Sequence, residues 1–178
     1  MNNVWGAVTR ATGVVATVLA VAALAYGFFF SSRNTGQRRR PAWWLDLHNW
    51  LGGLTLVFTV AHVVASYFDT DFAIGILQIL VPGTNRDAPW AVTWGVIATY
   101  LFAITTFTSW PRKRLRPRFW RLVHLSSVIA VGLAGLHAFQ FGTDATTLLF
   151  ETGLIALAAV SVYALAVRVL ALLVQRRS

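Results

Sequence analysis

The chain has 178 residues, of which 57% are hydrophobic and only 12% charged, and it carries a formal net charge of +9. This composition excludes an ordinary soluble domain and indicates a membrane protein. The chain has no cysteine, which excludes disulfides, iron–sulfur clusters and thiol nucleophiles, so any redox chemistry must come from a bound cofactor.

Five apolar segments are long enough to span a membrane, and the sequence therefore predicts an all-α integral membrane protein, a five-span helical bundle that forms one domain over residues 1–178. The expected spans are Ala7–Phe30, Trp43–Phe68, Trp90–Ser109, Phe119–Phe141 and Thr146–Val174. A further apolar run, Phe72–Val81, is too short to cross. We expect it to lie in the outer interface or to fold back over the mouth of the bundle.

The basic residues predict the orientation of the bundle, because loops rich in lysine and arginine stay on the cytoplasmic side. Thirteen of the 15 basic residues follow the first span, surround the loop after the third, or lie near the end of the chain. Only Arg10 and Arg86 fall on the other side. We therefore expect the N-terminus outside, the C-terminus in the cytoplasm, and a location in the cytoplasmic (inner) membrane. Because the basic residues lie beside apolar spans, we attribute the positive charge to the orientation of the protein in the membrane, and nucleic acid is not an expected partner. The thirteen are Arg33, Arg38, Arg39, Arg40, Arg112, Lys113, Arg114, Arg116, Arg118, Arg121, Arg168, Arg176 and Arg177.

The second span carries two histidines on one face. His48 and His62 are 14 residues apart, which corresponds to about 21 Å along a helix in a hydrocarbon core of about 30 Å. One histidine therefore lies in each leaflet. The same face, within about 40° of one line, also carries small and polar residues between and beyond them: Gly52, Thr55, Thr59 and Ser66.

The fourth span repeats the arrangement with His124 and His137, and these four are all the histidines of the chain. Because the second and fourth spans run parallel, His48 and His124 are expected level at the inner leaflet, and His62 and His137 at the outer one. Neutral imidazoles are good axial ligands for haem iron, so two level pairs predict two stacked bis-histidine haems. Hydrogen-bonded helix contacts, a metal site or a proton pathway are the competing interpretations. A tetrahedral zinc site would need its ligands in one place.

One feature opposes an ideal fourth helix. His124 and His137 are 13 residues apart, which places them roughly 140° from each other around a regular helix. Gly132 and Gly135 lie between them. We expect a kink, a change of winding or a strong tilt in this span.

These motifs resemble the ferric reductase-like transmembrane domains. The resemblance rests on H-x13-H beginning H-N-W-L-G-G in the second span, on H-x12-H in the fourth, and on T-S-W-P-R-K-R-L-R-P-R-F-W-R-L-V-H from Thr108 to His124. It covers about residues 42–141. The family includes the membrane haem domain of NADPH oxidases and ferric reductases, and the haem-binding subunit of the bacterial periplasmic methionine sulfoxide reductase system.

The resemblance implies that the four histidines ligate the iron of two b-type haems, and that electrons pass from the cytoplasmic side outward. His48 and His124 would hold the inner haem, and His62 and His137 the outer one. Oxidase members carry a cytoplasmic flavin and nicotinamide domain, whereas this sequence has no glycine-rich nucleotide fingerprint. It is therefore similar to a stand-alone haem-bearing electron-transfer subunit of such an oxidoreductase, and whether it is an enzyme by itself stays open.

The expected partners are membrane lipid, a separate electron-donor protein or a quinol, and an extracytoplasmic acceptor. A quinone or a flavin is a further candidate cofactor. Arg10 and Arg121 are candidates to meet the haem propionates at the outer and inner ends. Two alternatives stay open: a cytochrome b-like subunit of a quinol-oxidising complex, whose histidines recur similarly, and a non-redox proton-relay or transport subunit.

Overall fold

The computed structural model describes residues 4–32, 42–72, 74–110, 115–142 and 147–177. These residues form six helices and no strand. Five of the six are long and apolar enough to cross a membrane, which confirms the all-α, five-span prediction. The remaining helix, α3, has five residues and lies within the short apolar run after the second span. The helices are α1 (Val4–Ser31), α2 (Ala42–Phe68), α3 (Ile76–Leu80), α4 (Pro89–Ser109), α5 (Pro117–Phe141) and α6 (Leu148–Arg177).

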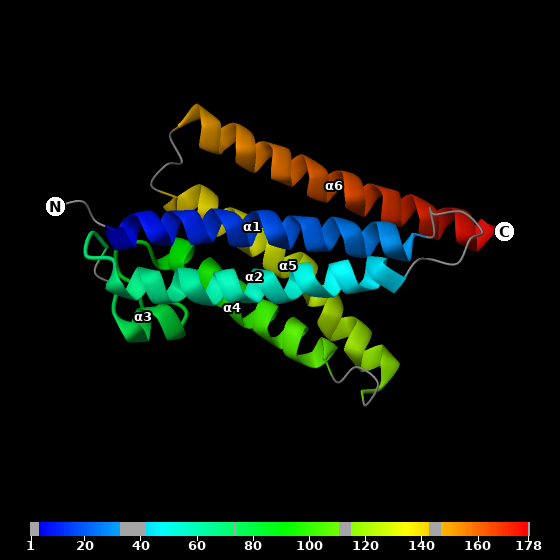
Figure 1. Ribbon diagram of the computed structural model, residues 1–178, viewed down its shortest axis with the longest axis horizontal. Coiled ribbons are helices and arrows are strands. Elements are labelled where there is room, and N and C mark those ends of the chain that lie inside the picture. Colours follow the sequence, from blue (N-terminus) through cyan, green and yellow to red (C-terminus); the bar gives the residue numbers. More distant parts are fainter. Residues whose placement is uncertain (1–3, 33–41, 73, 111–114, 143–146, 178) are drawn as a thin grey trace.

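The long helices are arranged as two antiparallel pairs and one outer helix (Figure 1). Helix α1 packs along α2, and α4 packs along α5. Helix α6 lies on the far side of α1, and the guanidinium of Arg168 in α6 donates to the carbonyl oxygen of Ser31 at the end of α1, at 2.7 Å. Proline opens both α4 and α5, where its missing N–H costs nothing because the first turn of a helix has no internal acceptor for it.

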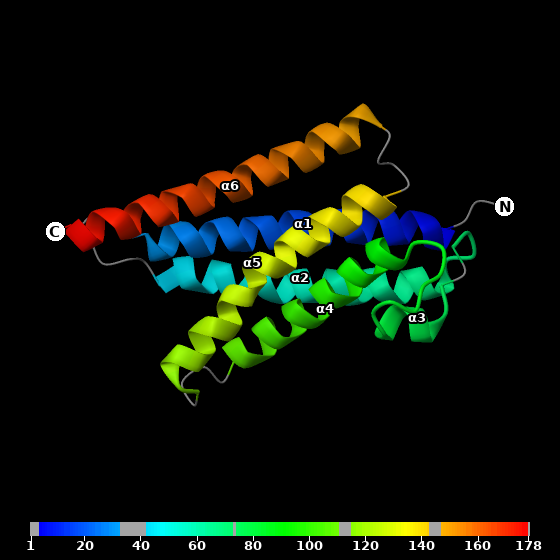
Figure 2. The ribbon, with the colours of Figure 1, turned by 180° about the vertical axis from the view of Figure 1, so that it is seen from behind.

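The structure shows how α5 presents both His124 and His137, although they lie on different faces of a regular helix. It stays α-helical from Pro117 to Phe141, so its winding does not change. Seen from either side, α4 and α5 run at a strong tilt to α1 and α2 (Figure 2). Because a tilted helix crosses its neighbour, different faces of it meet the same neighbour at its two ends.

The segment between α2 and α4 is folded against one end of the bundle, which we call the α3 end. The Tyr100 hydroxyl of α4 donates to the carbonyl oxygen of Leu80, and Thr93 Oγ1 accepts the N–H of Gly83 at 2.8 Å. Gly83 has φ +82°, a conformation that glycine adopts without strain. The opposite end, where α2 and α5 begin, is called the C-terminal end because α6 finishes there.

The middle of the bundle is a packed apolar layer. Ala20 of α1, Phe102 of α4 and Ala130 of α5 form one buried cluster with Ala98. At the same level of α2, the Thr55 side chain is buried and donates to the carbonyl oxygen of Leu51 at 2.8 Å. Thr55 and Ala130 lie about halfway between the two histidines of α2 and of α5, so the layer separates the two ends of the bundle.

The side of the membrane that each end faces stays a prediction. Most of the loop residues that carry it lie outside the described residues: Arg33, Arg38, Arg39, Arg40, Arg112, Lys113 and Arg114.

Candidate functional site

The structure brings the four histidines together in two pairs. The rings of His48 and His124 lie with their centroids 5.8 Å apart at the C-terminal end. Those of His62 and His137 lie 6.0 Å apart at the α3 end. Each pair takes one residue from α2 and one from α5, as the sequence predicts, and the planes of the two rings are steeply inclined, at 68° and 79°.

Three of the histidines are held by carbonyl oxygens of a neighbouring helix. His48 Nδ1 lies 3.0 Å from the carbonyl oxygen of Ala23, and His62 Nδ1 lies 2.8 Å from that of Thr9. Both acceptors belong to α1. His137 Nδ1 lies 2.8 Å from the carbonyl oxygen of Ala91 in α4. A carbonyl oxygen can only accept, so each Nδ1 carries the proton and Nε2 is the basic nitrogen.

His124 is held by a side chain instead. Its Nδ1 lies 3.2 Å from the hydroxyl oxygen of Ser109, the last residue of α4. The Ser109 hydroxyl donates its own proton to the carbonyl oxygen of Thr105 at 2.7 Å, so it accepts from His124. The ring of Trp120 stacks on that of His124, with centroids 4.8 Å apart and planes 22° apart. All four histidines are therefore fixed in the same tautomer.

Glycines make room for three of these imidazoles. An ideal Cβ on Gly13 would lie 2.9 Å from His62 Nδ1, one on Gly95 would lie 2.9 Å from His137 Nδ1, and one on Gly27 would lie 3.2 Å from His48 Cε1. Real Cβ atoms essentially never approach another heavy atom closer than 3.0 Å. In each case the glycine lies one helical turn after the residue whose carbonyl accepts the bond, at positions 9 and 13, 23 and 27, and 91 and 95. The imidazole thus comes close to bare backbone, where its N–H reaches the second lone pair of a helical carbonyl.

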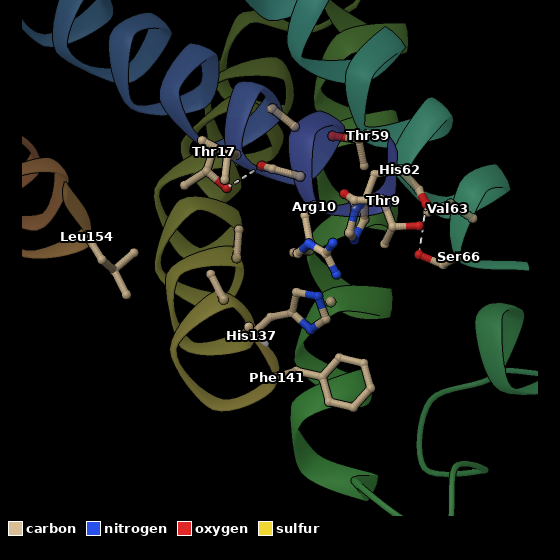
Figure 3. Close-up of a pocket in the computed structure, with 18 of the residues that line it drawn as sticks. Thr9, Arg10, Thr17, Thr59, His62, Val63, Ser66, His137, Phe141 and Leu154 are labelled. Carbon is tan, nitrogen blue, oxygen red and sulfur yellow. Dashed lines mark hydrogen bonds between the residues drawn. The ribbon is translucent and has the colours of Figure 1, made fainter. Parts of the chain in front are cut away.

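A cavity of about 780 Å³ surrounds the pair at the α3 end. His62, His137, Gly13 and Gly95 line it together with Arg10, and most of the remaining lining is apolar. In Figure 3 the side chain of Arg10 points toward the space between the two histidines. This volume is in the range of sites for large organic ligands. The Thr9 hydroxyl, also in this lining, is buried without a hydrogen-bond partner among the described residues.

The two arginines singled out from the sequence differ in position. Arg10 lines the cavity with His62 and His137. Arg121 is exposed on α5, and its Nε donates to the carbonyl oxygen of Pro117 in its own helix at 3.3 Å. The structure therefore brings Arg10 into the site, whereas the described contact of Arg121 lies on the surface of its helix.

The histidine pairs fit a cofactor that needs two axial ligands. Imidazoles bound through Nε2 to opposite sides of one metal ion have centroids about 6 Å apart, given bonds of about 2 Å and a ring radius of about 1.1 Å. The observed spacings of 5.8 and 6.0 Å agree with this value. Haem iron uses two such ligands, because the macrocycle supplies the others. Among the described residues, no group of three or more histidine or carboxylate side chains could hold a metal ion unaided.

Comparison with known proteins identifies the family of the chain. The chain matches the family described as "Ferric reductase like transmembrane component" over residues 12–135. The match begins in α1, before the motifs that carry the resemblance, and it therefore includes Gly13, Gly27 and Gly95. No curated protein matches the chain.

Proposed function

The chain belongs to the ferric reductase-like transmembrane family, and we propose that it carries electrons across the membrane through two b-type haems. His48 and His124 would hold one haem, and His62 and His137 the other. When bound, the haem iron supplies reversible one-electron chemistry. One observation carries the proposal: each histidine has its Nδ1 proton committed to a neighbouring helix, which leaves Nε2 as the ligand atom at a spacing suited to one iron.

The residues around the histidines do the protein's part of this work. A second bond from the ligand's other nitrogen fixes ring orientation and raises ligand basicity. The carbonyls of Thr9, Ala23 and Ala91 and the hydroxyl of Ser109 would serve this role. Arg10 would balance the negative carboxylates of the haem at the α3 end.

We place donor and acceptor at opposite ends of the bundle. The thirteen basic residues of the expected cytoplasmic loops and C-terminus support a cytoplasmic membrane location with the His48–His124 pair on the inside. A separate electron-donor protein or a quinol would deliver electrons there. The α3 end, with the His62–His137 pair, would then pass them to an acceptor outside the membrane.

The bonding of the histidines disfavours a proton relay. A relay needs groups that accept a proton and pass one on, such as carboxylates, hydroxyls or water. Three Nδ1 protons here end on backbone carbonyls, which accept a hydrogen bond but do not hand on a proton. This pattern suits fixed ligands. A cytochrome b-like subunit of a quinol-oxidising complex would share it and stays the alternative.

The test is the haem content of the purified full chain. We expect a b-type reduced-minus-oxidised spectrum and two haems per chain. His48→Ala and His124→Ala should each remove the same haem, and His62→Ala and His137→Ala the other. A chain that takes up no haem would refute the proposal. A chain in which His48→Ala and His137→Ala remove the same spectral component would refute the pairing.

A further inference from the structure

Trp44 has a buried polar atom that the protein leaves unused. Its indole nitrogen is inaccessible to solvent and has no hydrogen-bond partner among the described residues. An indole N–H can only donate, and buried tryptophans usually find an acceptor for it. A buried donor without one lowers the stability of the fold. An acceptor that belongs to a bound group would remove this cost.

The position of Trp44 indicates where that group lies. Trp44 precedes His48 by four residues in α2, so the two side chains leave the helix about 40° apart and about 6 Å apart along its axis. Trp44 is therefore one turn from the His48–His124 pair, toward the C-terminal end of the bundle. Tyr26 and Trp43 pack against its ring, with centroids 5.1 and 5.4 Å away. These contacts explain how the ring is packed, but they give its N–H no acceptor.

We propose that the indole N–H of Trp44 donates to a carboxylate of the haem held by His48 and His124. The inference rests on the proposed function and deepens it. A b-type haem is apolar except for two carboxylates on one edge, and burying those charges in the middle of the bundle would be far costlier than placing them near its end. That end is where Trp44 lies. The donor is neutral, and it holds the carboxylate without an arginine, in keeping with the exposed position of Arg121.

The sequence around the other ligand shows the same spacing. Trp120 precedes His124 by four residues, as Trp44 precedes His48. Its ring stacks on the imidazole of His124, so its established contact is with the ligand ring. The proposal is carried by Trp44 alone.

The experiment compares Trp44→Phe with the matched control Trp43→Phe, a neighbouring tryptophan that is 55% exposed. Both variants keep an aromatic ring. The measurement is the rate at which the full chain, in detergent, loses each haem to apomyoglobin, with the His48–His124 haem identified as the component missing in His124→Ala. Trp44→Phe should lose that haem about ten-fold faster, the effect of removing one hydrogen bond to a charged group, and its midpoint potential should fall because the carboxylate charge is less neutralised. The other haem, and both haems of Trp43→Phe, should behave as in the parent.

A second measurement uses the parent and a modified cofactor, so the test stands even if Trp44→Phe does not fold. The apo chain reconstituted with haem dimethyl ester, which has no carboxylate charge, should release it from this site about ten-fold faster than it releases haem. Trp44→Phe should release the ester no faster than the parent does. Equal release of haem by Trp44→Phe and Trp43→Phe, or an effect on the other haem, would overturn the inference. A parent that binds no haem would instead refute the proposed function.

Discussion

The imidazole of His62 lies directly against Gly13, so closely that a Cβ on this glycine would be 2.9 Å from Nδ1. The neighbour that would have to move is a ring already bonded to the carbonyl oxygen of Thr9 at 2.8 Å. Gly13→Ala should therefore break that bond or displace the ring, and the chain should lose the His62–His137 haem while keeping the other. Haem content and the spectrum of the remaining component measure this.

Gly132→Ala is the matched control for Gly13→Ala. Gly132 also lies in a spanning helix, but it is exposed and its Cβ would meet nothing within 4 Å. Alanine favours helix more than glycine does, so this variant should keep both haems. Full haem content in Gly13→Ala would show that the close contact with His62 has no part in binding.

The three close glycines should differ in their sensitivity to substitution. The Cβ of Gly95→Ala would lie 2.9 Å from His137 Nδ1, whereas that of Gly27→Ala would lie 3.2 Å from His48 Cε1. A contact of 3.2 Å can be relieved by a shift of a few tenths of an ångström. Gly95→Ala should thus remove the haem at the α3 end, and Gly27→Ala should only weaken binding at the other end. The measurement is the haem content of the two variants under the same conditions. A larger loss of haem from Gly27→Ala than from Gly95→Ala would contradict the prediction.

Ser109→Ala should weaken the His48–His124 haem alone. The substitution removes the hydroxyl that accepts from His124 Nδ1, and losses of such outer partners typically cost about 10- to 100-fold in metal affinity. We expect faster haem loss from this site and a changed midpoint potential. Ser127→Ala is the control, because its hydroxyl bonds only the main-chain oxygen of His124 among described contacts. Equal rates of haem loss from Ser109→Ala and Ser127→Ala would show that Ser109 does not support this site.

The orientation can be tested with single cysteines, since the chain has none of its own. Arg86 lies between α3 and α4 at the α3 end, and Arg118 lies in the first turn of α5 at the opposite end, and both are exposed. Arg86→Cys should react with an impermeant thiol reagent from outside and Arg118→Cys only from the cytoplasmic side. Labelling of Arg118→Cys from outside would reverse the bundle and the proposed direction of electron flow.

The sequence predicted the two histidine pairs but not the groups that hold them. Histidines are rare in membrane spans, so four at matching depths indicate a site. The acceptor for His62 is a main-chain carbonyl 53 residues away in the chain, and any residue has a carbonyl. A usable signal existed nonetheless: Gly13 and Gly27 are 14 residues apart, as are His48 and His62. In an antiparallel helix pair, equal spacings place each glycine opposite one histidine.

The spacing in α5 was a different kind of problem. The sequence showed that His124 and His137 could not share one face of an upright ideal helix, and it left three explanations. The choice depends on how α4 and α5 cross α1 and α2, which is decided by packing across the bundle and not by residues within α5. The structure shows the tilt, and the described α5 keeps regular winding.

The two antiparallel helix pairs have a consequence for how the protein is made. Helices α1 and α2 contain both the imidazoles and the hydrogen-bond acceptors of one half of each site, and α4 and α5 contain those of the other half. Each hairpin can therefore orient its own histidines as soon as it inserts in the lipid. Each cofactor would then connect the two hairpins, because it takes one ligand from each. Since a ligand stabilises only the state that binds it, haem supply would govern how much assembled protein accumulates in the cell.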